Sequence, residues 1–303
     1  MAPTFTCSTR TAAYLLLGVM AACSTEVGLG TGVDGGPGTA DGAGAPSTDA
    51  SDLPMDAAGP RTDAGQTTDG GSVSTGPNKP NCKYQAHKTG LTALQQAGGL
   101  SFSVYAPSNY DPQVGHTVVV LMHGQDSNGV PELNALWKPI ADQEQLVLVA
   151  PKGSRPSTNG DATVGNWATA DLNRVLALMT EVDDCYDVFP KKHILWGFSA
   201  GTFYGYLLGL GAAERFSGLA MGGANTSFAR QNGVSPASAK WKIPVSHVHG
   251  VQDMNPISVT YQDRTDFQGR GHVFTLHEHP GGHSITAAQV RSQFDDLRAS
   301  SAP

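Results

Sequence analysis

Residues 197–201 read Gly197-Phe198-Ser199-Ala200-Gly201, directly after the apolar run His193-Ile194-Leu195-Trp196 and directly before a helix-like segment. A strand, a glycine-flanked serine and a helix in this order are the sequence form of a nucleophile elbow. A serine hydroxyl is a weak nucleophile, so it has to stand clear of the backbone on a tight turn where a base can reach it. Glycines at both ends leave room for that turn because they carry no Cβ. The stretch predicts a reactive serine between a strand and a helix of an α/β fold.

A carboxylate and a histidine follow downstream, each just past a strand-like run. Asp253 comes after the run of residues 245–249, and His283 ends the glycine-rich segment that follows residues 272–278. The elbow belongs to folds in which the catalytic groups occur in the order serine, acid, histidine along the chain. We therefore predict Ser199 as the nucleophile, Asp253 as the acid and His283 as the base.

An apolar run upstream, residues 117–122, ends in His123-Gly124-Gln125 and is typical of a buried central strand that enters a loop. Acyl transfer passes through a tetrahedral intermediate, whose oxyanion needs two hydrogen-bond donors. We assign the backbone amides of Gln125 and Ala200 to that role.

Two other residues near these segments are candidates for contact with a substrate. Trp167 stands in a turn-like segment before a long helical pattern, and His123 begins the loop just described. An aromatic ring and an imidazole in such places can face a ligand. A buried structural tryptophan is the alternative for Trp167.

Histidines also alternate on two strand-like runs, His247 with His249 and His277 with His279. Either pair presents two nitrogens on one face of a strand, and so two ligands to a metal ion. No third ligand stands at a recognisable spacing, so we expect no metal, and we expect His249 to shape the loop that carries the acid. His279 competes with His283 for the role of base, and the glycine-rich loop before His283 favours the latter.

Together these segments resemble the α/β-hydrolase superfamily, and within it secreted polyhydroxybutyrate depolymerases and feruloyl or acetyl-xylan esterases. The resemblance covers about residues 82–303 and is carried, in chain order, by His123-Gly124, Gly197-Phe198-Ser199-Ala200-Gly201, His249-Gly250-Val251-Gln252-Asp253 and Gly281-Gly282-His283. It implies the α/β-hydrolase fold and extracellular ester hydrolysis without a cofactor. It carries the roles of nucleophile, acid and base to the same three side chains, and the oxyanion donors to the same two amides.

The first 23 residues have the features of an export signal: a positive charge at Arg10, an apolar stretch over residues 12–22 and small residues before Cys23. The apolar stretch is shorter than the ~20 residues that a membrane-spanning helix needs. Its end resembles a bacterial lipobox, so we expect Cys23 to be lipidated and to hold the protein on a membrane, facing outward. Ordinary cleavage with an incidental Cys23 is the alternative. The predicted location is extracytoplasmic, lipid-anchored or secreted.

Residues 24–80 consist almost entirely of Gly, Ala, Thr, Ser, Asp and Pro and show no apolar periodicity. Such a segment cannot bury enough surface to fold, and it is predicted to be a flexible tether. It holds eight acidic and two basic residues, so most of the chain's net charge of −7 lies there. The remaining charge gives no electrostatic reason to expect nucleic-acid binding.

The cysteines agree with export. If Cys7 leaves with the signal and Cys23 is acylated, Cys82 and Cys185 remain as one pair. In an oxidising compartment such a pair is expected to form a disulfide. Two free buried thiols are the alternative.

Residues 81–303 are enough for one domain with a sizeable core, which we expect to be a monomer. Strand-like runs that alternate with helical patterns predict a mostly parallel sheet covered by helices. The runs are residues 100–106, 117–122, 146–150, 193–197, 216–221, 245–249 and 272–278. No long insertion follows Ser199, so any lid is short and the site is open.

These features predict a secreted serine esterase that hydrolyses carboxylic esters, of the polyester or acylated polysaccharide type, through an acyl-enzyme. Two alternatives stay open. One is an acyltransferase with the same triad, and the other is a non-catalytic surface-binding lipoprotein on a hydrolase scaffold.

Overall fold

The computed structural model of the chain describes residue 82, residues 89–96 and residues 99–300. All of them belong to the unit Thr68–Pro303. The predicted export signal (1–23), the tether (24–80) and the lipidation of Cys23 lie outside the described residues and stay predictions. Within the described ranges, no helix combines the length and the apolar character needed to cross a membrane.

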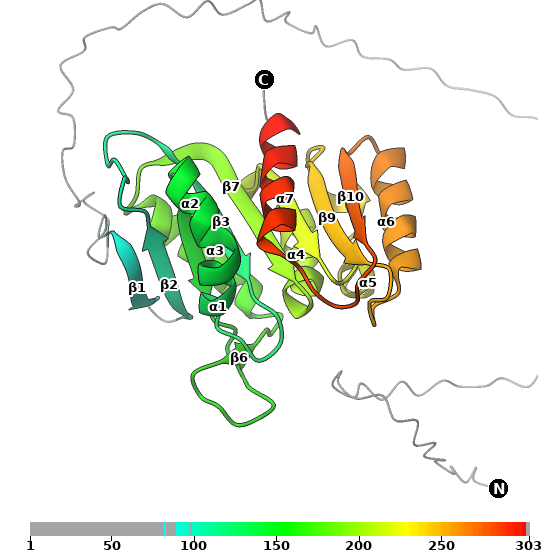
Figure 1. Cartoon of the computed structure of the whole chain (residues 1–303), viewed down its shortest axis with the longest axis horizontal. Coiled ribbons are helices and arrows are strands. Elements are labelled where there is room, and N and C mark those ends of the chain that lie inside the picture. The colour runs from blue at the N-terminus through cyan, green and yellow to red at the C-terminus, as the bar shows by residue number, and fades with distance from the viewer. Residues whose placement is uncertain (1–81, 83–88, 97–98, 301–303) are drawn as a thin grey trace, which may run out of the picture. The chain divides into compact units, whose positions relative to one another are not determined.

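An eight-stranded sheet runs through this unit in the order β1-β2-β4-β3-β7-β8-β9-β10 (Figure 1). Its strands are β1 (Gly90–Gln95), β2 (Ser101–Ala106), β3 (His116–Met122), β4 (Val147–Pro151), β7 (Val188–Phe198), β8 (Gly218–Gly222), β9 (Val245–Gly250) and β10 (Phe274–His279). From β4 to β10 every neighbouring pair is parallel, whereas β2 is antiparallel to both β1 and β4. Two short strands, β5 (Arg155–Pro156) and β6 (Gly165–Asn166), pair separately.

Helices cover both faces of the sheet (Figure 1). They are α1 (Val130–Glu132), η1 (Leu133–Trp137), α2 (Lys138–Glu144), α3 (Asp171–Asp183), α4 (Ala200–Gly211), η2 (Ala213–Arg215), α5 (Ser227–Gln231), η3 (Pro236–Ser238), α6 (Ile257–Gly269) and α7 (Ala287–Ser300). Side chains of η1, α2 and α7 pack on one face, and those of α3, α4 and α6 pack on the other. The predicted α/β fold with a mostly parallel, helix-covered sheet is confirmed.

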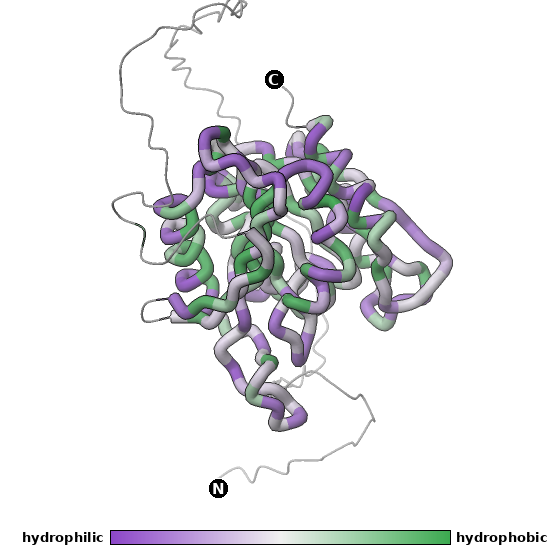
Figure 2. The backbone as a smooth tube through the Cα atoms, turned by 60° about the vertical axis from the view of Figure 1, so that its left-hand side comes forward, coloured by the Kyte–Doolittle hydropathy of each residue, from purple (hydrophilic) through white to green (hydrophobic). Residues whose placement is uncertain are grey.

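β3 shows how one strand supplies both halves of the core. Val119 and Leu121 pack into the cluster beneath η1, α2 and α7, whereas Val120 and Met122 pack into the cluster beneath α3 and α4. Successive side chains of a strand point to opposite faces, so a strand covered on both sides must be apolar throughout. Figure 2 shows hydrophobic segments gathered inside the unit and hydrophilic ones on its outer turns. Because the central strands are parallel, their carboxyl ends lie at the same edge of this buried sheet.

All seven predicted strands are present, with shifted ends; the largest shift is in β7, which begins at Val188. The helical pattern over residues 168–184 corresponds to α3. Of the eight strands in the large sheet, only β1 lacks a predicted counterpart; it alternates between half-buried and exposed residues at the edge of the sheet. An edge strand of this kind lacks the apolar run that marks a buried strand.

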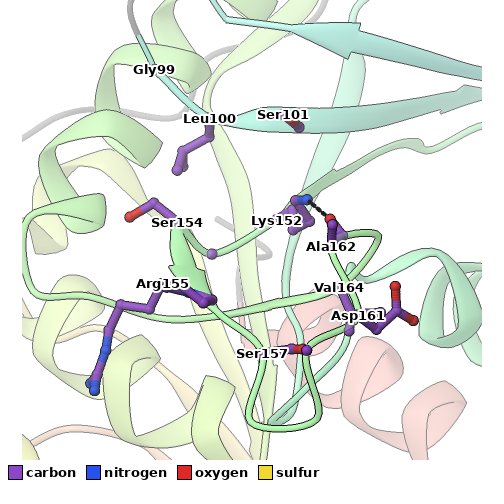
Figure 3. Close-up of a pocket in the computed structure, with 13 residues that line it drawn as sticks. Gly99, Leu100, Ser101, Lys152, Ser154, Arg155, Ser157, Asp161, Ala162 and Val164 are labelled. Carbon is purple, nitrogen blue, oxygen red and sulfur yellow. Dashed lines mark hydrogen bonds between the residues drawn. The ribbon is translucent and has the colours of Figure 1, made fainter.

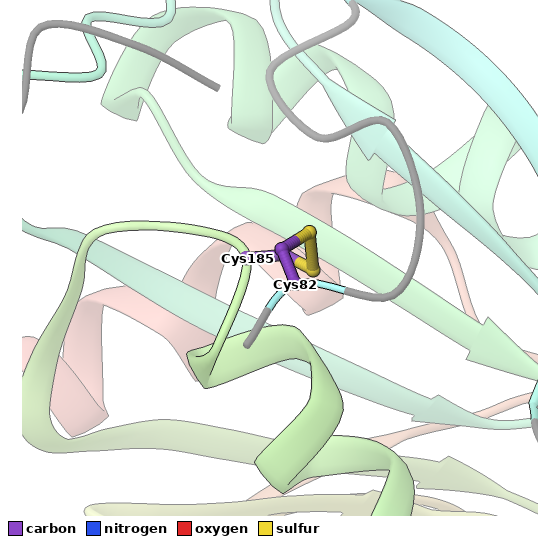
Figure 4. Close-up of a disulfide and its surroundings, with 2 residues drawn as sticks. All are labelled: Cys82 and Cys185. Carbon is purple, nitrogen blue, oxygen red and sulfur yellow. A yellow bond between two sulfur atoms is a disulfide. The ribbon is translucent and has the colours of Figure 1, made fainter. Parts of the chain in front are cut away.

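A disulfide joins Cys82 to Cys185, as predicted (Figure 4). It connects the start of the described domain with the turn that follows α3, across a sequence separation of 103 residues. The two Cα atoms lie 4.7 Å apart, and Cys185 is fully buried. The bridge therefore fixes the first segment of the domain against a core helix.

Candidate active site

Ser199 occupies the turn between β7 and α4, with φ of 56° and ψ of −120°. A positive φ costs a non-glycine residue on the order of 1–3 kcal/mol, so the surrounding contacts must hold it. The Ser199 N–H donates to the carbonyl oxygen of Gly222 at 2.9 Å. The hydroxyl of Thr202 lies 2.8 Å from the carbonyl oxygen of Gly197 and 2.6 Å from that of Gly222. The strand, strained serine and helix that the sequence predicts are present.

The two flanking glycines are required by packing. A Cβ on Gly201 would lie 1.8 Å from the carbonyl oxygen of Met122, and one on Gly197 would lie 2.6 Å from the carbonyl oxygen of Gly201. Both obstacles are backbone atoms of packed elements, which cannot move without displacing β3 or α4. The absence of a side chain at these positions lets the helix begin directly against the strand ends.

The structure brings Ser199, His283 and Asp253 together from three separate parts of the chain. His283 Nε2 lies 2.8 Å from the Ser199 Oγ, and His283 Nδ1 lies 2.8 Å and 3.0 Å from the two carboxylate oxygens of Asp253. The Asp253 side chain is 1% exposed and that of His283 is 22% exposed. A carboxylate only accepts hydrogen bonds, so Nδ1 carries the imidazole proton and the lone pair of Nε2 faces the serine hydroxyl. This arrangement can remove a proton from Ser199.

The loop that carries Asp253 is anchored by Asn255, a residue that the sequence analysis did not single out. The Asn255 N–H donates to Asp253 Oδ1 at 2.8 Å, and its side-chain amide donates to the carbonyl oxygen of Gly223 at 2.7 Å. His249 Nε2 lies 2.8 Å from the Asn255 carbonyl oxygen, so His249 contacts the loop that it was expected to shape. These contacts fix the carboxylate in the orientation that meets His283.

A buried chain of polar groups continues from His249 into the core. His247 Nε2 lies 3.3 Å from His249 Nδ1, and the Tyr206 hydroxyl lies 2.7 Å from His247 Nδ1. Burial, together with the neighbouring His249, lowers the pKa of His247 to about 3. The imidazole is therefore neutral at neutral pH, and its nitrogens are taken up by Tyr206 and His249.

The second histidine pair is not at the serine. His277 Nε2 lies 2.6 Å from a carboxylate oxygen of Asp296. His279 packs against Gly250 and Gly281, and its buried Nε2 has no hydrogen-bond partner among the described residues. The geometry therefore favours His283 over His279 as the base. Over the described ranges, no group of three or more histidine, cysteine or acidic side chains could hold a metal ion.

The loop after β3 lies next to the serine. A Cβ built on Gly124 would stand 3.8 Å from the Cβ of Ser199, which places the following amide, that of Gln125, beside the turn. The Ala200 amide is at the first position of α4, where helical N–H groups have no partner within the helix. Within the described part of the chain, neither amide donates to a protein acceptor. Both predicted donors are thus free to bind an oxyanion.

Trp167 and His123 are placed differently from the prediction. Trp167 is 2% exposed and His123 is fully buried, and their rings stack with centroids 4.6 Å apart. The Trp167 indole N–H donates to the His123 carbonyl oxygen at 2.8 Å. His123 Nδ1 lies 2.6 Å from the carbonyl oxygen of Gly124. The expectation that these side chains contact substrate is wrong because both are covered by protein, and they instead support the loop that carries Gln125.

A cavity of about 400 Å³ lies between the start of β2 and the segment 152–164 (Figure 3). Ser101, Ser154 and Leu100 are among the residues that line it, and Lys152 Nζ donates to the carbonyl oxygen of Ala162 at 2.8 Å. No residue of the Ser199 site lines this cavity. The same segment reaches the serine site from its other end, since the Gly153 N–H donates to His123 Nε2 at 3.0 Å.

No protein-family model matches the chain. A bifunctional acetylxylan esterase/xylanase of Neocallimastix patriciarum is 28% identical over 160 residues, which are 52% of this chain and 22% of that protein. The chain thus spans about a fifth of the length of the curated relative it matches.

Solved structures of esterases share the fold. Esterase PE8 superimposes with a TM-score of 0.55 at 19% identity, covering 66% of this chain and 99% of that one. An acetyl xylan esterase from Aspergillus awamori gives 0.53 at 13% identity, covering 68% and 98%. A ferulic acid esterase from Anaeromyces mucronatus gives 0.52 at 14% identity, covering 71% and 91%. The strand order and these superpositions show that the chain shares the α/β fold of these esterases.

Proposed function

We propose that this protein is a secreted serine esterase that removes acyl groups from polysaccharides. The observation that carries this proposal is the continuous line of contacts from the Ser199 hydroxyl through His283 to the buried carboxylate of Asp253. This arrangement of nucleophile, base and orienting acid is suited to acyl transfer.

In the first half of the reaction, Ser199 Oγ attacks the ester carbonyl carbon while its proton passes to His283 Nε2. Asp253 stabilises the resulting imidazolium, and the amides of Gln125 and Ala200 bind the oxyanion. As the intermediate collapses, the bond between carbon and the alcohol oxygen breaks, and His283 returns the proton to that oxygen. The alcohol leaves, and the acyl group remains on Ser199.

In the second half, water replaces the alcohol. His283 takes a proton from the water, the hydroxide adds to the acyl carbon, and the bond to Ser199 Oγ breaks with return of the proton to the serine. The carboxylic acid is released and the enzyme is regenerated. Every proton in this cycle moves through one imidazole, so the reaction needs no cofactor.

The substrate class is supported by the esterases that the chain resembles. The curated relative is named for acetylxylan and two of the similar structures for acetyl xylan and ferulic acid. We propose acetyl or feruloyl esters on a xylan-type polysaccharide. The predicted export signal and lipidation at Cys23 would place the domain outside the cell on a long tether, which suits a polymer that cannot enter.

The test is product release from defined substrates by the full-length protein. We expect free acetate from acetylated xylan, or ferulate from feruloylated arabinoxylan, and no 3-hydroxybutyrate from a polyhydroxybutyrate film.

The Ser199→Ala variant should lower turnover of a soluble aryl acetate by ~10⁴-fold or more while thermal unfolding stays unchanged. Release from the polyester film alone would point to a depolymerase, and acyl transfer to an added sugar alcohol in preference to water would point to a transferase. Equal activity of Ser199→Ala and the unmodified protein would refute the catalytic assignment.

A further inference from the structure

The peptide that carries the Gln125 N–H is held on its N-terminal side by His123. In a trans peptide the C=O of Gly124 and the N–H of Gln125 point in opposite directions. The contact of 2.6 Å between His123 Nδ1 and the Gly124 oxygen therefore also sets the direction of the Gln125 N–H. The C-terminal side of Gln125 needs a restraint of its own because the chain there is a surface turn.

That restraint is centred on Asp126, which has φ of 51°. Its backbone N–H donates to Asn166 Oδ1 at 2.9 Å, and Asn166 Nδ2 donates back to Asp126 Oδ1 at 2.8 Å. The Thr158 N–H donates to the same carboxylate oxygen at 2.7 Å, and the Thr158 hydroxyl donates to the other. The reciprocal pair occupies the Asp126 N–H, whereas the Gln125 N–H donates to no acceptor among the described residues.

The partners of Asp126 come from a different segment. Asn166 is the last residue of β6, and Thr158 lies in the loop between β5 and β6, the loop that also lines the cavity of Figure 3. The isolated bridge from Ser127 to Gly165 adds a backbone link at the same place. The loop after β3 is thus fastened to the β5–β6 hairpin directly beside the predicted oxyanion donor.

We propose that Asp126 is a positioning residue for oxyanion stabilisation: with Asn166 it holds the backbone so that the Gln125 amide points at the acyl oxygen in the transition state. This inference rests on the proposed esterase function. It also explains why Asp126, a non-glycine residue, has a positive φ. Such a conformation persists only where the surrounding contacts impose it.

We call the contacts of Asp126 with Asn166 and Thr158 the clamp. Their chemistry requires a carboxylate at position 126. Donors from Thr158, Asn166 and the Gln125 side chain converge on the two oxygens of Asp126. A carboxylate accepts all of them, whereas an asparagine would offer one acceptor oxygen and turn an NH₂ group toward donors. Hydrogen bonds from the Thr158 hydroxyl and the Thr158 N–H lower the pKa of Asp126 to about 2, so the clamp stays charged across the working range of a hydrolase.

The test compares Asp126→Asn with Asp161→Asn in the full-length protein. Asp161 is a matched control because it lies in the same loop and accepts analogous bonds from the Thr163 N–H and hydroxyl, without touching the loop after β3. With a soluble aryl acetate, we expect kcat to fall about 10- to 100-fold in Asp126→Asn, with KM within about twofold, and no change in Asp161→Asn. Binding of an aryl trifluoromethyl ketone, which forms a tetrahedral adduct on the serine, should weaken by the same factor as kcat/KM.

Asn166→Asp is a second test, because it places two carboxylates together and should also lower kcat. If Asp126→Asn and Asp161→Asn behave alike, or if the ketone binds Asp126→Asn with unchanged affinity, the inference is wrong. If Asp126→Asn does not fold, Asn166→Asp decides the question, and an unchanged kcat in that variant overturns the inference. An unmodified protein without esterase activity would instead contradict the proposed function.

Discussion

The backbone N–H of Gly153 lies 3.0 Å from Nε2 of His123. A backbone N–H can only donate, so Nε2 is the acceptor and Nδ1 carries the proton. That proton points at the Gly124 carbonyl oxygen, 2.6 Å away. Burial lowers the pKa of His123, which keeps the ring neutral and the tautomer unique. The Gly153 N–H thus determines which nitrogen of His123 carries the proton, and so how the loop after β3 is held.

This relationship predicts different outcomes for two substitutions of His123. An asparagine can place its NH₂ where Nδ1 stands, whereas a glutamine places its oxygen near Nε2 and leaves the Gly124 carbonyl without a donor. We expect kcat for a soluble aryl acetate to fall about 100-fold in His123→Gln and clearly less in His123→Asn. Both variants should lose comparable stability, since both remove a ring stacked on Trp167, and thermal unfolding checks this. Equal kcat values in the two variants would contradict the role given to the Nδ1 proton.

Substitution of Gly201 tests the packing of the elbow. The added Cβ of Gly201→Ala would stand 1.8 Å from the Met122 carbonyl oxygen, so we expect a loss of more than about 4 kcal/mol in the free energy of unfolding, or no folded protein. Gly211 is the matched control, since it lies at the other end of α4 and a Cβ there meets nothing within 4 Å. Gly211→Ala should stabilise the protein by up to about 1 kcal/mol because alanine favours a helix over glycine. Urea unfolding of both variants measures the difference, and similar destabilisation by the two would show that the close approach is not what matters.

Stability should fall in acid because of His247. Its pKa is about 3 in the folded protein, against about 6.5 in an unfolded chain. Below about pH 6.5 the unfolded chain binds a proton that the folded protein does not, so the free energy of unfolding falls by about 1.4 kcal/mol per pH unit from this group alone. Above that pH the ring is neutral in both states and contributes no pH dependence. The pKa of His123 is lowered in the same sense and adds to the effect.

The measurement is urea unfolding between about pH 7.5 and pH 4, compared with the His247→Gln variant. Glutamine stays neutral over this range, so the variant should show a shallower loss of stability toward acid. Identical slopes for the two proteins would exclude His247 as a source of the pH dependence.

Removal of the disulfide should affect stability more than catalysis. Replacing Cys82 and Cys185 by alanine frees a loop of about 100 residues, and bridges of this kind contribute about 2–5 kcal/mol. Both cysteines lie away from the triad. We therefore expect kcat to be unchanged when it is measured at temperatures well below the melting temperature. Thermal unfolding with and without a reductant provides the comparison. Quantitative thiol labelling of both cysteines in the unreduced, denatured protein would show that the bridge does not form.

Much of the fold was predictable because its determinants are local. Strands buried on both faces need continuous apolar runs, and the turn at Ser199 needs glycines, so each leaves a mark in a few consecutive residues. The order of Ser199, Asp253 and His283 placed each at the end of a predicted strand, and parallel strands bring such ends to one edge of the sheet. That reasoning anticipated which three side chains would meet.

Burial and partner choice could not be predicted in this way. Trp167 and His123 were assigned to the substrate because both stand in segments typical of loops, but the structure buries them against each other. Asp126 and Asn166 are 40 positions apart, and no periodicity marks them as partners. Asn255 likewise shows its purpose only through the carbonyl and carboxylate groups that surround it.

The amino-acid sequence by itself determined the architecture and the chemical groups of the site, because hydrophobic periodicity and glycine-dependent turns act over short stretches of chain. The tertiary structure alone decided which amide faces the serine, which tautomer His123 adopts and which loop restrains Gln125. Those properties depend on hydrogen bonds between segments far apart in the chain, and their donors and acceptors find each other only once the sheet has brought the loops together.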